Sequence, residues 1–260
     1  NQYVKVPQLI LSPLKKNYLT KMSKITSYLY KILLPITFVF VLFSFQDGVV
    51  ANQEVATSDS ICNDVATKYQ KLNLSKSGLS LDAFEKAYTG WFTLNHQSKL
   101  NKKEILAIAD LSQSANMKRL YVLDLNRDTL LFRTFVAHGR NSGQEYAQSF
   151  SNEANSYQSS LGFYTTGDSY MGKHGLSLKL SGMEPSINDL AEQRAIVIHA
   201  ADYATENFIK QNGRLGRSLG CTAVSPEMCE PLIQILKDGA CLFMYFPDEQ
   251  YLKTSSLCKG

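Results

Sequence analysis

The first 46 residues of this 260-residue chain contain no acidic residue and no arginine, although they carry six lysines. The net charge of +4 comes from this segment, because the remaining residues hold 21 basic and 23 acidic side chains, a net charge of −2. Residues 47–260 therefore have no excess of basic side chains that could neutralise the phosphate groups of a nucleic acid. We therefore do not expect a nucleic acid partner.

A hydrophobic run of membrane-spanning length is also missing. The apolar stretch at residues 32–45, ILLPITFVFVLFSF, has fourteen residues, whereas a spanning helix needs about 20. Lysines precede this stretch and polar residues follow it, which is typical of a secretory signal peptide. Extending it back to Ile25 brings it closer to spanning length, so an uncleaved membrane anchor is the alternative. Either interpretation predicts an exported protein, periplasmic or associated with the cell envelope.

The chain begins with Asn1 rather than methionine, and we expect Met22 to be the true start. Residues 1–46 then comprise upstream residues followed by the signal peptide or membrane anchor. No cysteine follows the apolar stretch closely, which disfavours a lipid-attached form.

Histidine and cysteine are too scattered for a metal site. The chain has four histidines and five cysteines, and neither an H-x-x-x-H nor a C-x-x-C spacing occurs. We expect no metal and no cofactor.

What the sequence does contain is a series of short strands behind a helical segment. The expected order is a linker at residues 47–60, a helical lead-in at 61–112, a strand-rich domain at 113–247 and a loose tail at 248–260. In the lead-in, apolar residues recur on one helix face from Leu81 to Tyr88, with Ser80 as the cap and Gly90 as the end. We expect Trp91, the only tryptophan, to pack in the core.

The strand-rich domain begins with an expected hairpin of residues 120–125 and 129–137. Aromatic and glycine residues predict further hairpins at 161–180. A proline in the first turn predicts a helix from 225 to 238, followed by a strand at 240–246. Short strands with a few helices and glycine-rich turns indicate a mainly β fold with helices, of the α+β class.

Residues 196–224 contain the parts of a cysteine nucleophile with its base. His199 ends an apolar, β-branched run, and Cys221 lies in a glycine-rich turn. A thiol attacks a carbonyl as thiolate, and a nearby imidazole lowers its pKa and takes its proton. Gly220 lets the backbone turn so that the N–H groups of Gly220 and Cys221 can face an oxyanion. The alternative for each residue taken alone is a core histidine and a buried, inert cysteine.

Two arginines accompany this pair. Arg214 and Arg217 place positive charge in the turn before Cys221. Such charge favours the thiolate and can hold a substrate carboxylate.

The other cysteines leave a pairing problem open. If Cys221 stays free for catalysis, the remainder can form two disulfides in three pairings, or none. The four are Cys62, Cys229, Cys241 and Cys258. Cys241 lies in an apolar run, where we expect a buried thiol at least as readily as a bridge.

The order His199, eighteen intervening residues and Ser218-Leu219-Gly220-Cys221 resembles the signature of the L,D-transpeptidase (YkuD-type) catalytic domain. The resemblance covers residues 113–247, and its other segments are HGRNSG at 138–143, LGFYTTGDSYMGKHGLSLKLSGMEPSIND at 161–189 and RAIVIHAADY at 194–203. Together they look like the murein L,D-transpeptidase branch of the family, YkuD_2. One position departs from the pattern, because many members carry Arg or Asn where this chain has Ala223.

That resemblance implies a YkuD-like β-sandwich catalytic domain, preceded here by the helical segment, with the cysteine in a cleft between sheets. It also implies an exported peptidoglycan L,D-transpeptidase. Cys221 would attack a stem tetrapeptide, release D-Ala and keep the acyl group as a thioester, with His199 as base and Ser218 and Gly220 in the catalytic set. Transfer to the amine of a second stem would form a 3–3 cross-link.

Two alternatives share this resemblance. Water as acceptor would make the protein a murein L,D-carboxypeptidase. A catalytically silent peptidoglycan-binding module would keep the cleft without the reaction, and the departure at Ala223 favours it mildly. A papain-like peptidase fits less well, because its cysteine precedes its histidine in sequence.

Four further residues are expected near the site or its rim. Tyr164, Lys173 and His174 are candidates for lining a groove that binds an extended peptide, with an ordinary solvated hairpin as the alternative. His138 competes with His199 as the base, but the family pattern places the base just before the cysteine turn. We therefore expect His138 to have a structural or rim role.

Overall fold

Three helices, six successive strands and a mixed carboxy-terminal part make up residues 58–259, the part of the chain that the computed structural model describes. These residues belong to one compact unit, Ala56–Gly260. The helices are α2 (Ser58–Lys71), α3 (Leu74–Ser77), α4 (Leu81–His96), α5 (Glu206–Asn212), α6 (Pro226–Leu236) and α7 (Glu249–Thr254), with a 3₁₀ turn η1 at Asp202–Ala204. The strands are β1 (Ile105–Asp110), β2 (Leu120–Asp124), β3 (Thr129–Thr134), β4 (Gly162–Gly172), β5 (Gly175–Gly182), β6 (Val197–Ala200), β7 (Thr222–Val224) and β8 (Cys241–Tyr245).

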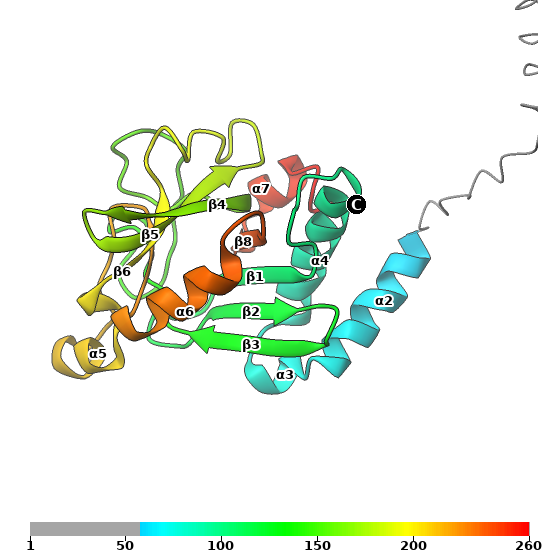
Figure 1. Ribbon diagram of the computed structural model, residues 1–260, viewed down its shortest axis with the longest axis horizontal. Helices are drawn as coiled ribbons and strands as arrows, with labels where there is room; N and C mark the ends of the chain where they lie inside the picture. Colours follow the sequence, from blue (N-terminus) through cyan, green and yellow to red (C-terminus); the bar gives the residue numbers. More distant parts are fainter. Residues whose placement is uncertain (1–57, 260) are drawn as a thin grey trace, which may run out of the picture. The chain divides into compact units, whose positions relative to one another are not determined.

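All strands of the described residues join one mixed sheet in the order β3-β2-β1-β8-β4-β5-β6-β7. Neighbouring strands are antiparallel, except that β1 runs parallel to β8 and β6 runs parallel to β7. The strands β4, β5 and β6 run at an angle to β1, β2 and β3 (Figure 1). The α+β class is therefore confirmed. A sandwich has two separate sheets. Here β1, β2 and β3 are joined through β8 to β4, β5, β6 and β7 in one continuous hydrogen-bonded sheet.

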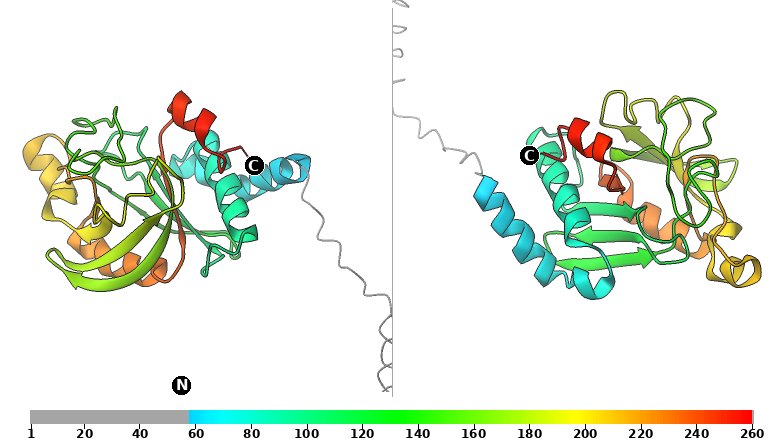
Figure 2. Two further views of the ribbon diagram at one scale, coloured as in Figure 1. Left: turned by 90° about the horizontal axis from the view of Figure 1, so that it is seen from above. Right: turned by 180° about the vertical axis from the view of Figure 1, so that it is seen from behind.

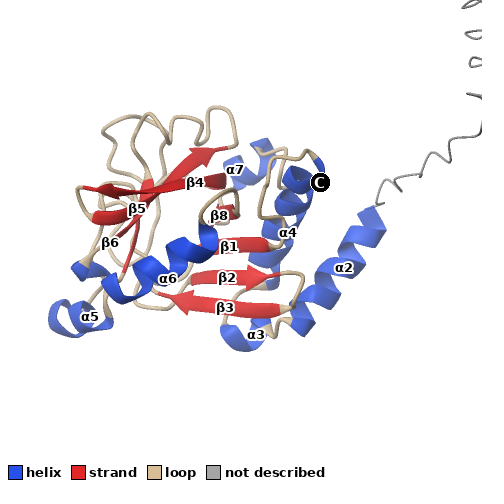
Figure 3. Ribbon diagram, viewed as in Figure 1, coloured by secondary structure: helices blue, strands red, loops and turns tan. Residues whose placement is uncertain are grey.

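Two helices cover opposite faces of this sheet. α4 contacts β1 and β8, whereas α6 contacts β1, β5 and β6. α6 lies in front of the strands in Figure 1, and α4 lies in front of them in the reversed view of Figure 2. Besides α6, loops gather over the part of the sheet that contains β4, β5 and β6 (Figure 3). That part is where the candidate site lies.

α4 begins as its sequence predicts but ends later. The side chain of Ser80 accepts a hydrogen bond from the backbone N–H of Ala83, as a helix cap does. The expected end at Gly90 is wrong, because the helix continues through this residue. Gly90 is needed for packing instead, since a Cβ there would lie 2.1 Å from the ring of Phe163. Trp91 is only 9% exposed, which confirms its place in the core.

Strand β1 lies within the region expected to be a helical lead-in. All six of its residues are buried, and it pairs with β2 on one side and β8 on the other. The expected boundary at residue 112 therefore falls between two paired strands of the same sheet.

The carboxy-terminal residues are ordered, so their interpretation as a loose tail is wrong for residues 248–259. They form α7 and bury Tyr251 and Leu257. The carboxylate of Glu184 holds this segment, because it accepts hydrogen bonds from the hydroxyl groups of Tyr251 and Ser255. Burial raises the pKa of Glu184.

The expected signal or anchor segment at residues 32–45 and the expected start at Met22 lie outside the described residues. Within residues 58–259, no helix has both the length and the apolar character needed to cross a membrane. Three described cysteines besides Cys221 are free and buried, namely Cys229, Cys241 and Cys258. The side chain of Cys62 lies outside the described part.

Candidate active site

His199 and Cys221 lie on neighbouring parallel segments of the sheet. The register of β6 and β7 pairs Ile198 with Thr222 and His199 with Ala223. Cys221 precedes Ala223 by two residues, so its side chain shares a face of the sheet with that of His199. The rise and spacing of strands put their Cα atoms about 8 Å apart, which a cysteine and a histidine side chain can span.

The ring of His199 is held at one nitrogen. Its Nδ1 lies 2.8 Å from the carbonyl oxygen of Ala200, and because a carbonyl only accepts, Nδ1 carries the proton. The residue is 4% exposed, and its ring stacks on that of His174 with 4.6 Å between the centroids. Burial lowers the pKa of His199, and the charge of His174 lowers it further, against the effect of the Ala200 carbonyl. The neutral imidazole therefore has an unprotonated Nε2.

The thiol of Cys221 has a raised pKa. Burial is the largest cause, and it outweighs a hydrogen bond with the backbone of Val197 and the charge of Arg194, which both lower this pKa. The sulfur lies 3.6 Å from the carbonyl oxygen of Ala195, to which the thiol donates. At neutral pH Cys221 is thus a thiol and His199 a neutral imidazole, and the thiolate that the neighbouring positive charges predicted is not favoured.

Ser218 organises the turn before Cys221. Its hydroxyl donates to the carbonyl oxygen of Cys221 at 2.7 Å and accepts from the N–H of Gly220 at 3.1 Å. The Gly220 N–H is therefore occupied, and it is not the oxyanion donor that the sequence predicted. Gly220 itself has φ +117°, and a Cβ there would lie 2.8 Å from the carbonyl oxygen of Gln158. Only glycine fits at this position.

Arg194 is a cation beside Cys221 and was not among the site residues predicted from the sequence. One of its nitrogens, Nη2, lies 3.5 Å from where a Cβ of Gly220 would be. The guanidinium donates to the carbonyl oxygens of Ser151 and Gln158, each at 2.8 Å. No ion pair in the described part of the chain involves Arg194, so its charge acts on Cys221 without a neutralising partner.

Arg214 and Arg217 form a cluster with Arg140. The charges of Arg214 and Arg140, together with the larger effect of burial, lower the pKa of Arg217. None of the three makes an ion pair with a described acidic side chain. The expected effect of Arg214 and Arg217 on the thiol of Cys221 is not found, because the guanidinium that lowers its pKa is that of Arg194.

Two hollows adjoin the paired segments. The larger, of about 370 Å³, is lined by His174, Tyr203 and residues 200–202 among others. Burial, and then the charge of the Cys221 sulfur, raise the pKa of Tyr203 to about 12. Tyr203 therefore belongs to the candidate site, and no sequence pattern pointed to it.

The smaller hollow, of about 160 Å³, includes Ala195, the residue that accepts from the thiol. Its polar lining residues are Tyr170, Lys179 and Glu192. Lys179 of β5 pairs with Val197 of β6, and Val197 lies two residues before His199. The side chains of Lys179 and His199 therefore share one face of the sheet. Strand alternation could have identified Lys179, but only once the pairing of β5 with β6 was known.

The three residues expected to line a peptide groove have different positions. His174 stacks on His199 and borders the larger hollow. Lys173 is exposed in the turn between β4 and β5, and no described hydrogen bond or ion pair ties it to the site. Tyr164 cannot line a groove, because it is 2% exposed and donates its hydroxyl to the carbonyl oxygen of Ser160 within the core. The predicted groove-lining role of Tyr164 is therefore wrong.

His138 is fully buried and supports the cysteine turn. Its Nδ1 accepts from the guanidinium of Arg119 at 2.7 Å, since arginine can only donate. Burial and the charge of Arg119 lower the pKa of His138 to about 4. Its backbone oxygen accepts from the N–H of Ser218 at 2.9 Å. These contacts favour the structural role over that of a base.

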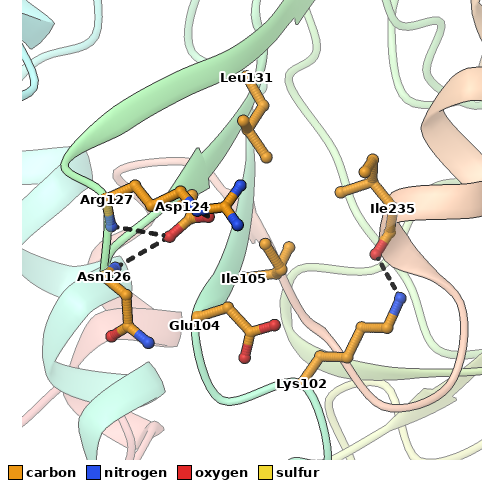
Figure 4. A pocket seen from close by; sticks show the side chains of 8 residues that line it. All are labelled: Lys102, Glu104, Ile105, Asp124, Asn126, Arg127, Leu131 and Ile235. Carbon is orange, nitrogen blue, oxygen red and sulfur yellow. Dashed lines mark hydrogen bonds and ion pairs between the residues drawn. The ribbon is translucent and has the colours of Figure 1, made fainter.

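A separate hollow of about 370 Å³ lies beside β2 and the end of α6 (Figure 4). Most of its charged groups have partners within the protein. Asp124 accepts from the backbone N–H groups of Asn126 and Arg127, and Lys102 donates to the carbonyl oxygen of Ile235 at 2.9 Å. It contains none of the site residues predicted from the sequence, so the candidate active site is the region around β6 and β7.

Comparison with known proteins identifies a matching family. The family model of the L,D-transpeptidase catalytic domain, YkuD_2, matches residues 75–245. The match begins in α3 and ends with the last residue of β8, so it includes α4 and every described strand. Among curated protein sequences, none matches this chain.

Several solved structures are similar to this chain at low identity. The L,D-transpeptidase from Mycobacterium smegmatis is 13% identical, with a TM-score of 0.35 over 55% of this chain and 59% of that chain. An L,D-transpeptidase from Stackebrandtia nassauensis is 14% identical, with a TM-score of 0.34 over 65% and 67%. The helical cell shape determining protein Pgp2 from Campylobacter jejuni is 16% identical, with a TM-score of 0.37 over 65% and 61%. The matched part thus spans 59% of the length of the mycobacterial structure.

Proposed function

Because this chain belongs to the L,D-transpeptidase catalytic domain family, we propose that it is a peptidoglycan L,D-transpeptidase with Cys221 as nucleophile and His199 as base. The observation that carries this proposal is the state of His199. Its Nδ1–H is held by the Ala200 carbonyl, its Nε2 is unprotonated, and its ring shares a sheet face with Cys221. A base that takes a thiol proton must be neutral and must offer a lone pair.

In the proposed reaction, the sulfur of Cys221 attacks the carbonyl carbon of the third residue of a stem tetrapeptide while the thiol proton moves to Nε2 of His199. The tetrahedral intermediate collapses when the C–N bond to the terminal D-Ala breaks, and Nε2 gives its proton to the departing amine. The side-chain amine of a second stem then attacks the thioester, and its proton passes through His199 to the leaving sulfur. The product is a 3–3 cross-link.

The oxyanion requires donors other than Gly220. We assign this role to the backbone N–H of Cys221, supported by the positive charge of Arg194 nearby. Ser218 keeps the turn in shape through its two hydrogen bonds. Its part in catalysis is therefore to position Cys221.

The substrate is recognised in two ways under this proposal. The cluster of Arg140, Arg214 and Arg217 offers unpaired positive charge for a stem carboxylate. The hollows beside His174 and Lys179 receive the peptide on either side of the thioester. If water reaches the thioester before an amine does, the product is that of an L,D-carboxypeptidase.

The location of this activity is the cell envelope, where peptidoglycan is found. Export rests on the cationic and apolar segment before residue 47, which also allows membrane attachment if it is not cleaved.

The test uses the full 260-residue chain, with Cys221→Ala as the matched variant, incubated with a disaccharide-tetrapeptide. Intact-protein mass spectrometry should reveal an adduct that lacks D-Ala in the wild type alone. Dimeric products would identify an amine acceptor, and tripeptide products would identify water. A folded wild-type protein with a reduced thiol and no adduct would reject the enzyme and favour the silent binding module.

A further inference from the structure

A groove of about 360 Å³ lies between residues 148–152, residues 185–187 and α7, at the other end of the loop that borders Gly220. Its lining contains no lysine or arginine. Its one acidic residue, Asp248, is already engaged, because it accepts from the backbone N–H of Tyr251 at the start of α7. The groove is therefore suited to a neutral ligand, unlike the arginine cluster at the active site.

Two amide side chains on different segments of this groove are available to a ligand. Gln148 belongs to the loop before β4, and Gln250 belongs to α7. Both are exposed, and neither side chain makes a hydrogen bond to another described residue. Each amide offers two donors and one acceptor oxygen. The third amide, that of Asn152, is instead bound to Asp189.

Aromatic and hydroxyl groups complete the lining. The ring of Phe150 packs against that of Phe246, with 5.0 Å between the centroids, and the hydroxyl of Tyr251 is bound to Glu184. Both lining rings are therefore held in place. Rigid apolar rings with a few free polar groups are the usual composition of a small-ligand site, and 360 Å³ falls within its usual size of about 300–1,000 Å³.

We propose that this groove binds an N-acetylated sugar of the peptidoglycan glycan strand. An acetamido group pairs with an amide side chain, sugar hydroxyl groups pair with the second amide and the lining hydroxyls, and the apolar face of the sugar ring packs on an aromatic ring. The glycan is the natural occupant if the proposed function is correct, because it carries the stem peptide on which Cys221 acts.

Arg194 connects the groove with the nucleophile. Its guanidinium donates to Ser151, which lines the groove, and to Gln158, whose carbonyl oxygen lies against Gly220. One side chain thus holds both ends of the loop between the two sites. A sugar in the groove and a peptide at Cys221 would lie on either side of this loop.

The test measures sugar binding by the full chain carrying Cys221→Ala, so that no acyl chemistry is involved. The probe is tetra-N-acetylchitotetraose, titrated calorimetrically, with maltotetraose as the sugar without acetamido groups. Saturable binding of the first sugar only is expected. Adding Gln148→Ala and Gln250→Ala should weaken it about tenfold, as the loss of two modest hydrogen bonds predicts. The matched control removes two exposed glutamines elsewhere, with Gln211→Ala and Gln234→Ala, and should leave binding unchanged.

Absence of saturable binding to folded protein would overturn this inference, as would equal binding of maltotetraose or unchanged binding by the Gln148 and Gln250 variant. The two proposals fail separately. An acyl-enzyme without sugar binding removes the groove proposal alone, and sugar binding without an acyl-enzyme in the wild type removes the enzyme proposal alone.

Discussion

At the residue scale, Cys221 and His199, the proposed nucleophile and base, are both uncharged at neutral pH. Burial raises the pKa of the thiol and lowers that of the imidazole, so both charged forms are disfavoured. If Cys221 and His199 are the nucleophile and base proposed above, proton transfer accompanies attack on the substrate. The charge that lowers the pKa of Cys221 is that of Arg194, which has no ion-pair partner in the described residues.

This charge balance predicts the pH dependence of alkylation at Cys221. The rate of iodoacetamide labelling, followed by peptide mass spectrometry, should rise with a midpoint above that of an ordinary cysteine. Arg194→Gln should move the midpoint higher, because a cation that stabilises the thiolate is lost, and Arg194→Lys should restore part of the shift. Arg214→Gln is the control and should not move it. A midpoint below that of free cysteine would contradict the neutral pair.

His138 predicts a specific loss of stability in acid. Its pKa is about 4 in the folded protein, against an ordinary value of 6.5. Between these values the unfolded chain binds a proton that the folded chain does not, so the free energy of unfolding falls as the pH drops from about 6.5 to 4. The difference corresponds to about 3 kcal/mol.

His138→Asn removes this titration and keeps an acceptor for Arg119. In urea unfolding at pH 7 and pH 4, its loss of stability should be about 3 kcal/mol smaller than that of the wild type. His96→Asn, at an exposed position, is the control. An unchanged loss in His138→Asn would mean that His138 is not held neutral by the fold.

Single residues also mark the limit of sequence reasoning. Tyr164 and Tyr170 are six positions apart and would share a face of a regular strand. The register of β4 against β5 shifts between Thr166 and Ser169, so Tyr164 is buried while Tyr170 is exposed at the smaller hollow. A bulge of this kind depends on the partner strand and leaves little trace in the sequence. Cys221 and His199 could be proposed from the sequence because their spacing is itself the motif.

At the scale of elements, the sequence located α4, α6 and most strands, but not their ends, and it did not predict α5 or α7. Gly90 illustrates the reason, since glycine ordinarily weakens a helix and was predicted to end α4. Its absent side chain makes room for the ring of Phe163, which comes from β4. The contact is formed by tertiary packing, and local patterns cannot reveal it.

Gly90→Ala should therefore destabilise the protein, although the same change in an exposed helix gains about 1 kcal/mol. The added methyl group would meet the Phe163 ring, and overpacking typically costs about 1–3 kcal/mol. Chemical denaturation gives the change in the free energy of unfolding. Combining the variant with Phe163→Leu should recover part of the loss. A stabilising Gly90→Ala would show that the ring has room to move.

α7 predicts a second effect on stability. Deleting residues 248–260 removes the buried Tyr251 and Leu257 and two hydrogen-bond donors to Glu184. Burial of two such side chains is worth about 1.5–3 kcal/mol each, so the free energy of unfolding should fall by at least about 3 kcal/mol. Removing only Lys259 and Gly260 is the control. Equal stability of the two truncated proteins would restore the interpretation as a loose tail.

At the scale of the whole described unit, one continuous sheet contains all the described strands. No break in strand pairing separates β1, β2 and β3 from the strands that carry the candidate site. Sequence patterns predicted the class and most strands, but not the order of the strands. That order depends on pairings such as β1 with β8, whose residues are far apart in the chain.

One continuous sheet predicts one unfolding transition. Fluorescence of Trp91 reports on α4, whereas far-ultraviolet circular dichroism reports on the helices and sheet together. In urea the two signals should change with the same midpoint and the same slope. Separate midpoints would mean that part of the sheet unfolds on its own.

The parallel pairing of β1 with β8 also affects how the molecule is made. Leu106 pairs with Cys241, so the centre of the sheet joins residues that are far apart in the sequence. Contacts of such long sequence separation slow folding, because loop-closure entropy must be overcome before they form. Until β8 is available, the facing edges of β1 and β4 have no partner strand. A newly made chain therefore keeps open sheet edges until residues 241–245 have been synthesised, and this interval is when those edges are most exposed to aggregation.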